Sequence, residues 1–349
     1  MWWVKDEEGA TAITVALMLL VIFGIGALVL DAGNLFWERR QLQNAADAAA
    51  LAAAWDYALG ESEAVAHESA RTFTSANSTR ASFLERFEPN LTAQEVSVTT
   101  HTGTEDEPFL IAWLAGVIGH DQYATRASAT ARWGGAALGP TVIPLSVSMC
   151  DFMGGPGPYS PAELDAHAAS LPTVDELPRD GDGNVTGGQI IVMHEPGDPD
   201  ACTFSPGFAA EDETKMPAGF GWLELDNPKS ACRVNITQYE SDGQFWVPTR
   251  GGTYPEGKTC LEANYRRAPL IPVFTGFESA PVKEYRLYAP ASFYITGLHM
   301  PPGAANPPGM TCPGGGGVWC IRGHFVQKVE HGAPIGGPSL GVTAIELSG

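Results

Sequence analysis

The chain has 349 residues, with 40 Asp and Glu side chains against 20 Lys and Arg, and a formal charge of −20 at pH 7. A negative charge of this size repels the phosphates of nucleic acids, so binding to DNA or RNA is disfavoured as the main task. Hydrophobic residues make up 44%, which is typical of folded chains and disfavours wholesale disorder. The length exceeds the usual single domain of roughly 100–200 residues, so we expect two folded units.

The first element in the chain is an uncharged apolar run from Ala10 to Leu30. As a helix it is roughly 31 Å long, which is enough to cross a hydrocarbon layer of about 30 Å. Trp2 stands before the run and Trp37 after it, where amphipathic rings favour the headgroup zones. The apolar core of a cleaved signal peptide is shorter, about 7–15 residues, so the run predicts a retained transmembrane helix. The alternative is a helix buried in a soluble core.

The helix is predicted to continue beyond the membrane as a stalk. Residues 35–59 contain neither Gly nor Pro, and eight of the ten residues 45–54 are alanine, the best helix former. Small side chains recur on one face at steps of three and four residues, so that a second helix can approach closely. These are Ala46, Ala49, Ala50 and Ala53. The alternative is that the alanines merely stabilise the stalk.

A small α+β unit is expected after the stalk. Apolar residues at helical spacing precede a proline, and strictly alternating residues follow it, which favours a helix and then a half-buried strand. The expected elements are helices Glu61–Phe87 and Phe109–Ile118 and strands Glu95–His101 and Tyr123–Trp133.

The composition changes near residue 134, where a Gly- and Pro-rich segment begins. Of the 27 prolines 25, and of the 40 glycines 32, lie at or after Gly134. Short apolar runs bounded by turn residues favour a mostly β unit, sandwich-like or irregular, with Ala162–Leu171 as its one short helix. The expected strands are Thr141–Met149, Gln189–His194, Gly219–Leu225, Pro269–Phe277, Glu284–Leu287, Ser292–Leu298, Cys320–Val329 and Ser339–Leu347.

The cysteines and the charges beside the apolar run give opposite predictions for the side of the membrane on which the C-terminal part lies. Lys5 precedes the run and Arg39 and Arg40 follow it, which by the positive-inside rule places the C-terminal part in the cytoplasm. The six cysteines are spaced singly through the Gly/Pro-rich segment, without a CxxC pair, which favours up to three disulfides in an oxidising compartment. Buried free thiols are the alternative. The cysteines are Cys150, Cys202, Cys232, Cys260, Cys312 and Cys320.

Motifs for chemistry are scarce in this sequence. It contains no HExxH and no G-x-G-x-x-G that opens a helix, no catalytic residue is predicted, and the protein is not expected to be an enzyme. Asp180, Asp182 and Asn184 alternate with glycines like the start of a calcium loop, whose ion prefers several oxygen ligands. An acidic turn is the alternative. No cofactor is expected apart from this structural calcium.

The N-terminal motifs follow one another in a characteristic order. A charged pair with Gly at Glu7–Gly9 precedes the apolar helix, Asp31 and Gly33 end it, and LQNAADAAALA follows at Leu42–Ala52. In this order they resemble the N-terminus of the TadE/TadG-like proteins of the Tad (Flp, type IVc) pilus. Shorter pieces also resemble longer members of that family. These pieces are Gln122–Trp133, Val142–Phe152, Gly219–Leu223, Pro272–Phe274 and Ala291–Gly297.

The resemblance implies a place in the bacterial inner membrane, with the N-terminus in the cytoplasm and the bulk outside. Related pilins are cut after a Gly that precedes the apolar helix, which here is the bond between Gly9 and Ala10. Many such substrates carry Glu five residues after the cut, where this chain has Thr14. Asp31 is implied to contribute to helix packing, by pairing with a neighbouring subunit's N-terminal amine or with the arginines after the span. A solvated interfacial acid is the alternative.

Together these observations predict an α+β fold class. A transmembrane helix continues into a long stalk, followed by a small α/β pilin-like head and a mostly β, Gly/Pro-rich domain with disulfides. The expected segments are a cytoplasmic leader-like segment 1–9, the transmembrane helix 10–30, the Ala-rich stalk 31–60, the head 61–134 and an extracytoplasmic β domain 135–349.

The predicted function is that of a minor pilin or assembly component of a Tad/Flp pilus, with a structural role in surface attachment. Its implied partners are other pilins and Tad assembly platform proteins, contacted through the N-terminal helix. The alternative is an extracellular ligand-binding (adhesin or receptor) or hydrolase domain on a pilin-like stalk. A pocket lined by Trp222, Trp246 and Trp319 would favour that alternative, whereas tryptophans in a core would not.

Overall fold

A computed structural model describes most of the chain and divides it into two compact units. Unit 1 comprises Met1–Arg132 and Leu347–Gly349, and unit 2 comprises Trp133–Glu346. The sequence analysis expects this boundary at residues 134 and 135. The residues that the structure does not describe are 1–7, 109, 112–121, 140–142, 156, 158, 195–201, 204–214, 217, 225–231, 233, 235, 237–244, 253, 279–282, 302–306, 316 and 349.

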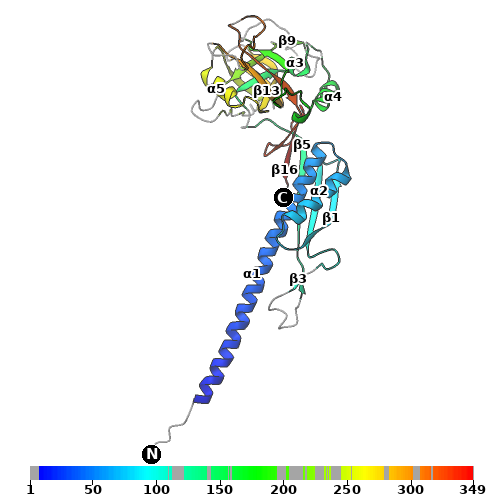
Figure 1. The fold of residues 1–349 in the computed structure, drawn as a ribbon, viewed down its shortest axis with the longest axis vertical. Coiled ribbons are helices and arrows are strands. Elements are labelled where there is room, and N and C mark those ends of the chain that lie inside the picture. The colour runs from blue at the N-terminus through cyan, green and yellow to red at the C-terminus, as the bar shows by residue number, and fades with distance from the viewer. Residues whose placement is uncertain are drawn as a thin grey trace, which may run out of the picture. The chain divides into compact units, whose positions relative to one another are not determined.

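Unit 1 is organised around one long helix. Helix α1 runs without interruption from Glu8 to Ala58, because no proline occurs in these 51 residues and the second half is rich in alanine. The chain then turns back at Gly60, whose φ of +78° is readily adopted only by glycine. Helix α2, Glu63–Ala76, follows, and its buried residues lie on one face at steps of four. Figure 1 shows α2 lying beside the C-terminal half of α1.

Three antiparallel strands of the five-stranded sheet β1-β2-β5-β16-β15 complete unit 1. Strand β2 (Glu95–Thr102) lies between β1 (Ser82–Asn90) and β5 (Arg126–Gly135). Burial alternates along β2 and β5, as expected for strands with one face on a core. The end of the chain also belongs to this unit, because the Ser348 amide donates a hydrogen bond to the carbonyl oxygen of Thr130 at 2.8 Å.

Two helices predicted for this region differ from the structure. The helix expected over Glu61–Phe87 ends at Ala76, and the chain from Ser82 onward forms β1. The apolar residues here are spaced as in a helix, but pairing with β2 decides the structure. Phe83 lies opposite His101, and strand β1 finds partners on β2 at both of its ends. Of the helix expected over residues 109–118, Leu110–Ile111 form strand β3 beside β4 (Gln122–Tyr123), and the rest lies outside the described residues. The strands predicted on either side are present.

Unit 2 is built on a sheet that closes into a ring of five strands. The strands are β6 (Leu145–Ser148), β10 (Phe220–Leu223), β11 (Phe245–Arg250), β12 (Leu270–Glu278) and β13 (Glu284–His299). Strand β10 pairs with β6 and β11, β12 pairs with β6 and β13, and β13 also pairs with β11. The β6–β12 pair is parallel and the others are antiparallel. The β unit is expected to be sandwich-like or irregular, and the structure shows one sheet that curls on itself rather than two stacked sheets.

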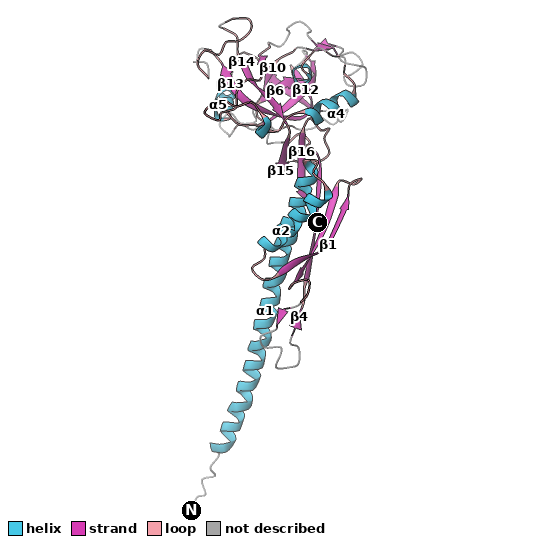
Figure 2. Ribbon diagram, turned by 45° about the vertical axis from the view of Figure 1, so that its right-hand side comes forward, coloured by secondary structure: helices cyan, strands magenta, loops and turns pink. Residues whose placement is uncertain are grey.

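The long strand β13 also extends the sheet outside the ring. Its second half pairs with β14 (Cys320–Val326), and β14 pairs with β7 (Gln189–Val192). Figure 2 shows β13, β14, β10, β6 and β12 gathered in this unit. The remaining strands are β8 (Cys202–Thr203), β9 (Lys215–Met216), β15 (Lys328–His331) and β16 (Val342–Leu347). Strands β15 and β16 form a parallel pair.

The core of unit 2 is rich in aromatic side chains. Trp222 packs edge-to-face on Trp319, with ring centroids 6.1 Å apart, and Phe274 stacks on Tyr285 at 4.4 Å. Such pairs contribute beyond their buried area, by about 0.5–1.5 kcal/mol each. The helices of this unit are α3 (Met149–Met153), α4 (Pro161–Ser170), the short 3₁₀ helix Val174–Glu176 and α5 (Pro255–Ala263). The prediction of a single short helix is thus wrong, although the predicted helix itself is present as α4.

The predicted fold class is confirmed at this level. A long apolar N-terminal helix precedes mixed α and β structure with many strands, and the C-terminal region contains disulfides.

Candidate membrane anchor and helix-docking site

The first half of α1 presents an apolar surface with no protein cover. Every large apolar side chain that is described between Ile13 and Leu30 is exposed, with Phe23 and Leu20 each at 71%. Exposed apolar surface of this extent is unfavourable in water and favourable in a hydrocarbon layer. The helix is also long and apolar enough to cross a membrane. This arrangement is consistent with a single-pass membrane protein.

The second half of α1 is buried against α2 and the sheet of unit 1. Its buried face follows the helical repeat, and each of its apolar members has no exposed surface. These residues are Leu42, Ala45, Ala46, Ala49, Ala50, Ala53 and Ala54. Small side chains let α2 approach α1 closely, and Ala66 and Ala70 of α2 are buried as well.

This burial changes the interpretation of the alanine face. The predicted packing residues Ala46, Ala49, Ala50 and Ala53 are buried within unit 1, where α1 packs against α2 and β2 of the same chain. A neighbouring subunit cannot reach a face whose side chains have no exposed surface. We refer to this buried face of α1, from Glu38 to Ala54, as the docking face.

Two hydrogen bonds fix the docking face on the sheet. The Thr100 hydroxyl on β2 donates to the backbone carbonyl of Leu42 at 3.1 Å. The Gln43 side-chain amide donates to the carbonyl of Ser128 on β5 at 3.2 Å and to the carboxylate of Asp47 at 2.8 Å. The Leu42 carbonyl thus ties α1 to β2, and Gln43 of the QNAAD run ties it to β5.

The docking face begins at a buried ion pair. Glu38 is fully buried, and its carboxylate lies 3.8 Å from the Nε of Arg80, which is one-third exposed. Burial raises the pKa of Glu38, and the positive charge of Arg80 opposes that shift. Arg80 also lies over the Trp37 ring at 5.7 Å and donates to the Tyr123 hydroxyl at 2.9 Å.

The sequence analysis does not identify this pair. The spacing indicates that Glu38 lies on the buried face of the helix, because it continues the series 42, 46, 49 and 53 toward the N-terminus in steps of three and four. A charged residue in line with a buried face requires a partner of opposite charge. That partner, Arg80, follows α2 in the sequence and is brought to Glu38 only by the fold.

The residues implied by the resemblance at the two ends of the apolar run have separate positions. Gly9 and Ala10 lie in the first turn of α1, and their side-chain surroundings lie outside the described residues. Asp31 is half-buried, and a Cβ added at Gly33 would meet no atom within 4 Å. The structure therefore does not bring these residues together into one site, and cleavage between Gly9 and Ala10 stays a prediction.

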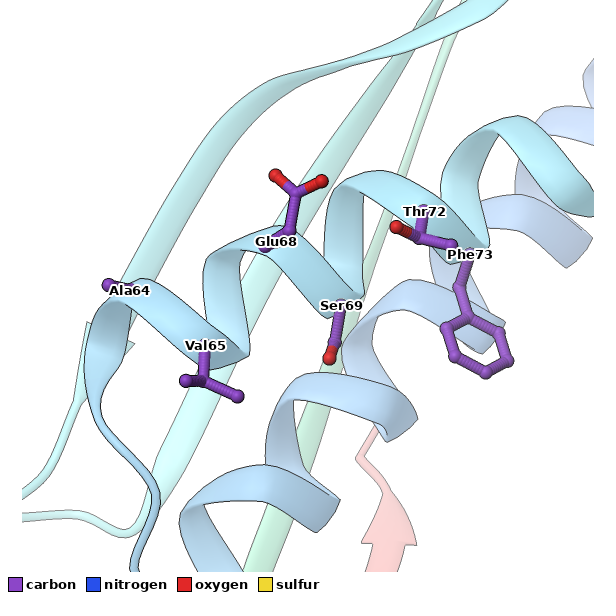
Figure 3. A pocket seen from close by; sticks show the side chains of 6 residues that line it. All are labelled: Ala64, Val65, Glu68, Ser69, Thr72 and Phe73. Carbon is purple, nitrogen blue, oxygen red and sulfur yellow. The ribbon is translucent and has the colours of Figure 1, made fainter.

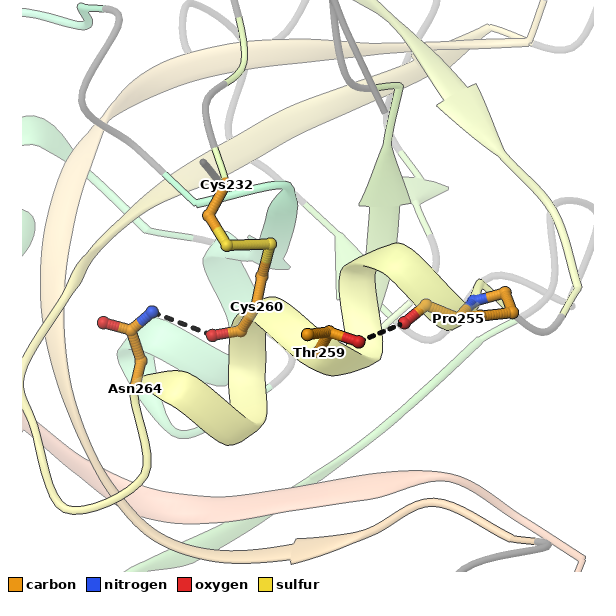
Figure 4. The surroundings of a disulfide bond; sticks show 5 residues. All are labelled: Cys232, Pro255, Thr259, Cys260 and Asn264. Carbon is orange, nitrogen blue, oxygen red and sulfur yellow. Dashed lines mark hydrogen bonds between the residues drawn. A yellow bond between two sulfur atoms is a disulfide. The ribbon is translucent and has the colours of Figure 1, made fainter. Parts of the chain in front are cut away.

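Two disulfides are described in unit 2. Cys232 is bonded to Cys260 on α5, and Cys312 is bonded to Cys320 at the start of β14. Figure 4 shows the first bond, together with the hydrogen bond from the Asn264 side chain to the Cys260 carbonyl at the end of α5. Cys150 is also disulfide-bonded, whereas the side chain of Cys202 lies outside the described residues.

The predicted calcium residues form a hydrogen-bonded turn. The carboxylate of Asp180 accepts the backbone N–H groups of Asn184 at 2.8 Å and of Asp182 at 3.0 Å, and the Asn184 bond is the main cause that lowers the pKa of Asp180. The Asn184 side-chain oxygen accepts from the Arg266 guanidinium at 2.6 Å. A guanidinium occupies an oxygen that a cation would need, so these contacts favour the acidic-turn alternative. In the described part of the chain no group of three or more His, Cys, Asp or Glu is placed to hold a metal ion.

Two of the three tryptophans belong to the core of unit 2. Trp222 and Trp319 are buried in the core of unit 2, at 2% and 5% exposure, and Trp246 is half-buried. A shallow hollow lies instead on α2, lined by that helix alone: Ala64, Val65, Glu68, Ser69, Thr72 and Phe73. Figure 3 shows Val65, Ser69 and Phe73 on one side of the helix and Glu68 on another, so polar groups do not converge there.

The buried titratable side chains of unit 2 serve the core. The Tyr285 hydroxyl and Nε2 of His194 lie 2.8 Å apart, and both residues are buried. Burial raises the pKa of Tyr285, so the phenol stays neutral and hydrogen-bonded. This pair joins β13 to the end of β7 and is part of the packing.

Comparison with known proteins identifies the N-terminal helix. Residues 9–56 match the model of a family described as putative Flp pilus-assembly TadE/G-like. The matched residues comprise both the exposed apolar half of α1 and the docking face. Searches of curated proteins and of solved structures found no match to this chain.

Proposed function

Because residues 9–56 are a TadE/G-like domain, which supports involvement in Flp (Tad) pilus assembly, we propose that this protein is a membrane-anchored minor pilin or assembly component of such a pilus. One observation carries the proposal: a single helix has an exposed apolar first half and a second half fixed to its own head. An anchored pilus component requires both an apolar helix segment that enters the membrane and a firm connection from that segment to its folded head. Its role is structural and not catalytic.

The partners are other pilins and the platform proteins of the assembly machinery, contacted within the membrane. The docking face is occupied by α2 and the sheet, so it is not available to them. The exposed apolar surface between Ile13 and Leu30 is the part of α1 that remains free for lateral packing. In a bilayer such contacts depend on close van der Waals fit between helices.

The proposed place is the bacterial inner membrane, with the N-terminus in the cytoplasm and the rest of the chain outside. The disulfides support this orientation, because they form and persist in oxidising compartments. Unit 2 then serves outside the membrane as a base, tip or adhesive element in surface attachment. Protease added to spheroplasts should degrade unit 2, and full protection of unit 2 in intact spheroplasts would contradict this orientation.

The deciding experiment is N-terminal mass spectrometry on the protein from membranes and from sheared pili, in separate fractions. A mature start at Ala10 with peptides in the sheared fraction would identify a processed minor pilin. An intact Met1 confined to membranes would identify a resident assembly component. Absence of any piliation defect in a strain that lacks the protein would refute both forms of the proposal.

A further inference from the structure

Two arginines beside the apolar half of α1 form no ion pair among the described residues. Unit 1 contains seven arginines, all described, and four of them pair with glutamates: Arg71, Arg80, Arg126 and Arg132. Arg39 and Arg40 are exposed, and within the described residues neither forms an ion pair or side-chain hydrogen bond. The chain has twice as many acidic as basic side chains, so two adjacent exposed cations form a local positive patch that is available to an anionic partner.

The helix places the backbone of these cations about 6–8 Å outside the headgroup layer, within reach of a long side chain that extends back toward the membrane. Arg39 lies roughly 13 Å beyond Leu30 along the helix axis, and a headgroup layer is about 5–7 Å deep. Side chains of a helix point back toward its N-terminus, so the long arginine side chains reach toward the lipid. Phe36, at three and four residues before the arginines, is on the same face and 72% exposed. An exposed aromatic ring at this level is typical of the headgroup zone.

We propose that Arg39 and Arg40 bind the phosphate groups of anionic phospholipids on the side of the membrane where the head lies. Charge complementarity selects this partner, and the site is continuous with the apolar surface that enters the bilayer. Bound phosphates would fix the depth of α1, so that the buried Glu38–Arg80 pair stays outside the hydrocarbon. The inference rests on the single-pass anchor of the proposed function.

The proposal also accounts for a conflict in the sequence. The positive-inside rule places residues such as Arg39 and Arg40 in the cytoplasm, whereas the disulfides favour the opposite side. Phosphate binding gives the two arginines a role on the head side, because guanidinium groups match phosphate geometry and stay charged at any physiological pH.

Native mass spectrometry of the full chain tests this inference. The protein is equilibrated in micelles with equal amounts of phosphatidylglycerol and phosphatidylcholine, and retained lipids are counted. We expect phosphatidylglycerol to be preferred, and Arg39→Gln/Arg40→Gln to lower its apparent affinity by about 5-fold per arginine, or roughly 30-fold. Arg39→Lys/Arg40→Lys should keep most of the preference.

The matched control is Arg86→Gln/Arg132→Gln, which removes two charges from the sheet of unit 1. Arg86 is exposed and without an ion pair among the described residues, and Arg132 stands on β5. An equal loss in this control, or an unchanged preference in Arg39→Gln/Arg40→Gln, would overturn the inference. Carbonate extraction of membranes tests the anchor independently of the phosphate site. Release of the wild-type protein would refute the anchor. Retention of the protein together with no lipid preference would refute only the phosphate site.

Discussion

Substitution of Arg80 by Met should destabilise the packing of the docking face, beginning at Glu38. Removing one member of a buried ion pair costs about 3–5 kcal/mol, because the other charge is left without compensation. The Arg80 side chain is 34% exposed, so solvent screens part of this effect, and we expect about 2 kcal/mol. Met retains the apolar stem, so the change reports on the charge and on the hydrogen bond to Tyr123.

The pH dependence of this effect has a definite sign. Burial raises the pKa of Glu38 above its usual value of 4.5, and loss of Arg80 raises it further. An acid with a raised pKa in the folded state contributes its stability below the unfolded pKa, and that stability is lost as the pH rises through the folded pKa. Arg80→Met should therefore change the stability of the docking face little at a pH below 4.5 and lower it increasingly toward neutral pH. Glu38→Gln/Arg80→Met should recover the docking face at neutral pH.

Hydrogen exchange with mass spectrometry on the full chain in detergent measures this locally. Peptides over residues 38–54 should exchange roughly 30-fold faster in Arg80→Met at neutral pH, after correction for intrinsic rates. Peptides over β12 in unit 2 serve as the internal control. Two results would refute the reasoning: Glu38→Gln alone as harmful as Arg80→Met, or no recovery in the double variant.

Three further changes test the packing of the two units. Ala50→Leu overfills the docking face and should destabilise unit 1 by about 1–3 kcal/mol, measured as faster exchange of residues 38–54, whereas unchanged exchange would mean that the face is open. Gly221→Ala places a methyl group against the Tyr285 hydroxyl, so the melting temperature of unit 2 should fall; an unchanged value would contradict this contact. Loss of the Cys232–Cys260 bond, which closes a separation of 28 residues, should destabilise unit 2 by about 3–4 kcal/mol in chemical denaturation. Alkylation of these two cysteines in non-reduced, denatured protein would show that the bond is absent.

The N-terminal helix could be predicted from the sequence because its signals are local. An uncharged run of sufficient length, an alanine-rich continuation and the absence of proline act over neighbouring residues, and α1 follows them from Glu8 to Ala58. The strands around residues 95–101 and 123–133 were predictable for the same reason, since their alternation is a local pattern.

What could not be predicted depends on contacts between distant residues. Residues 82–87 carry a helical spacing, yet they form β1 because β2 offers an edge with matching side chains. The alanine face indicated close packing but not its partner, and only the fold shows that α2 and β2 of the same chain cover α1. The closing pair β11–β13 joins residues about 40 positions apart, and nothing in either strand alone predicts it.

The hydrogen bond between Ser348 and Thr130 has a consequence for how such a protein can change over evolution. Unit 1 is completed by residues from both sides of unit 2, so unit 2 is an insertion carried by an otherwise continuous anchor domain. An inserted module can be exchanged or enlarged while α1 keeps its contacts with α2 and β2. Joining Arg132 to Leu347 should therefore keep α1 packed on α2 and β2, which hydrogen exchange over residues 38–54 would check.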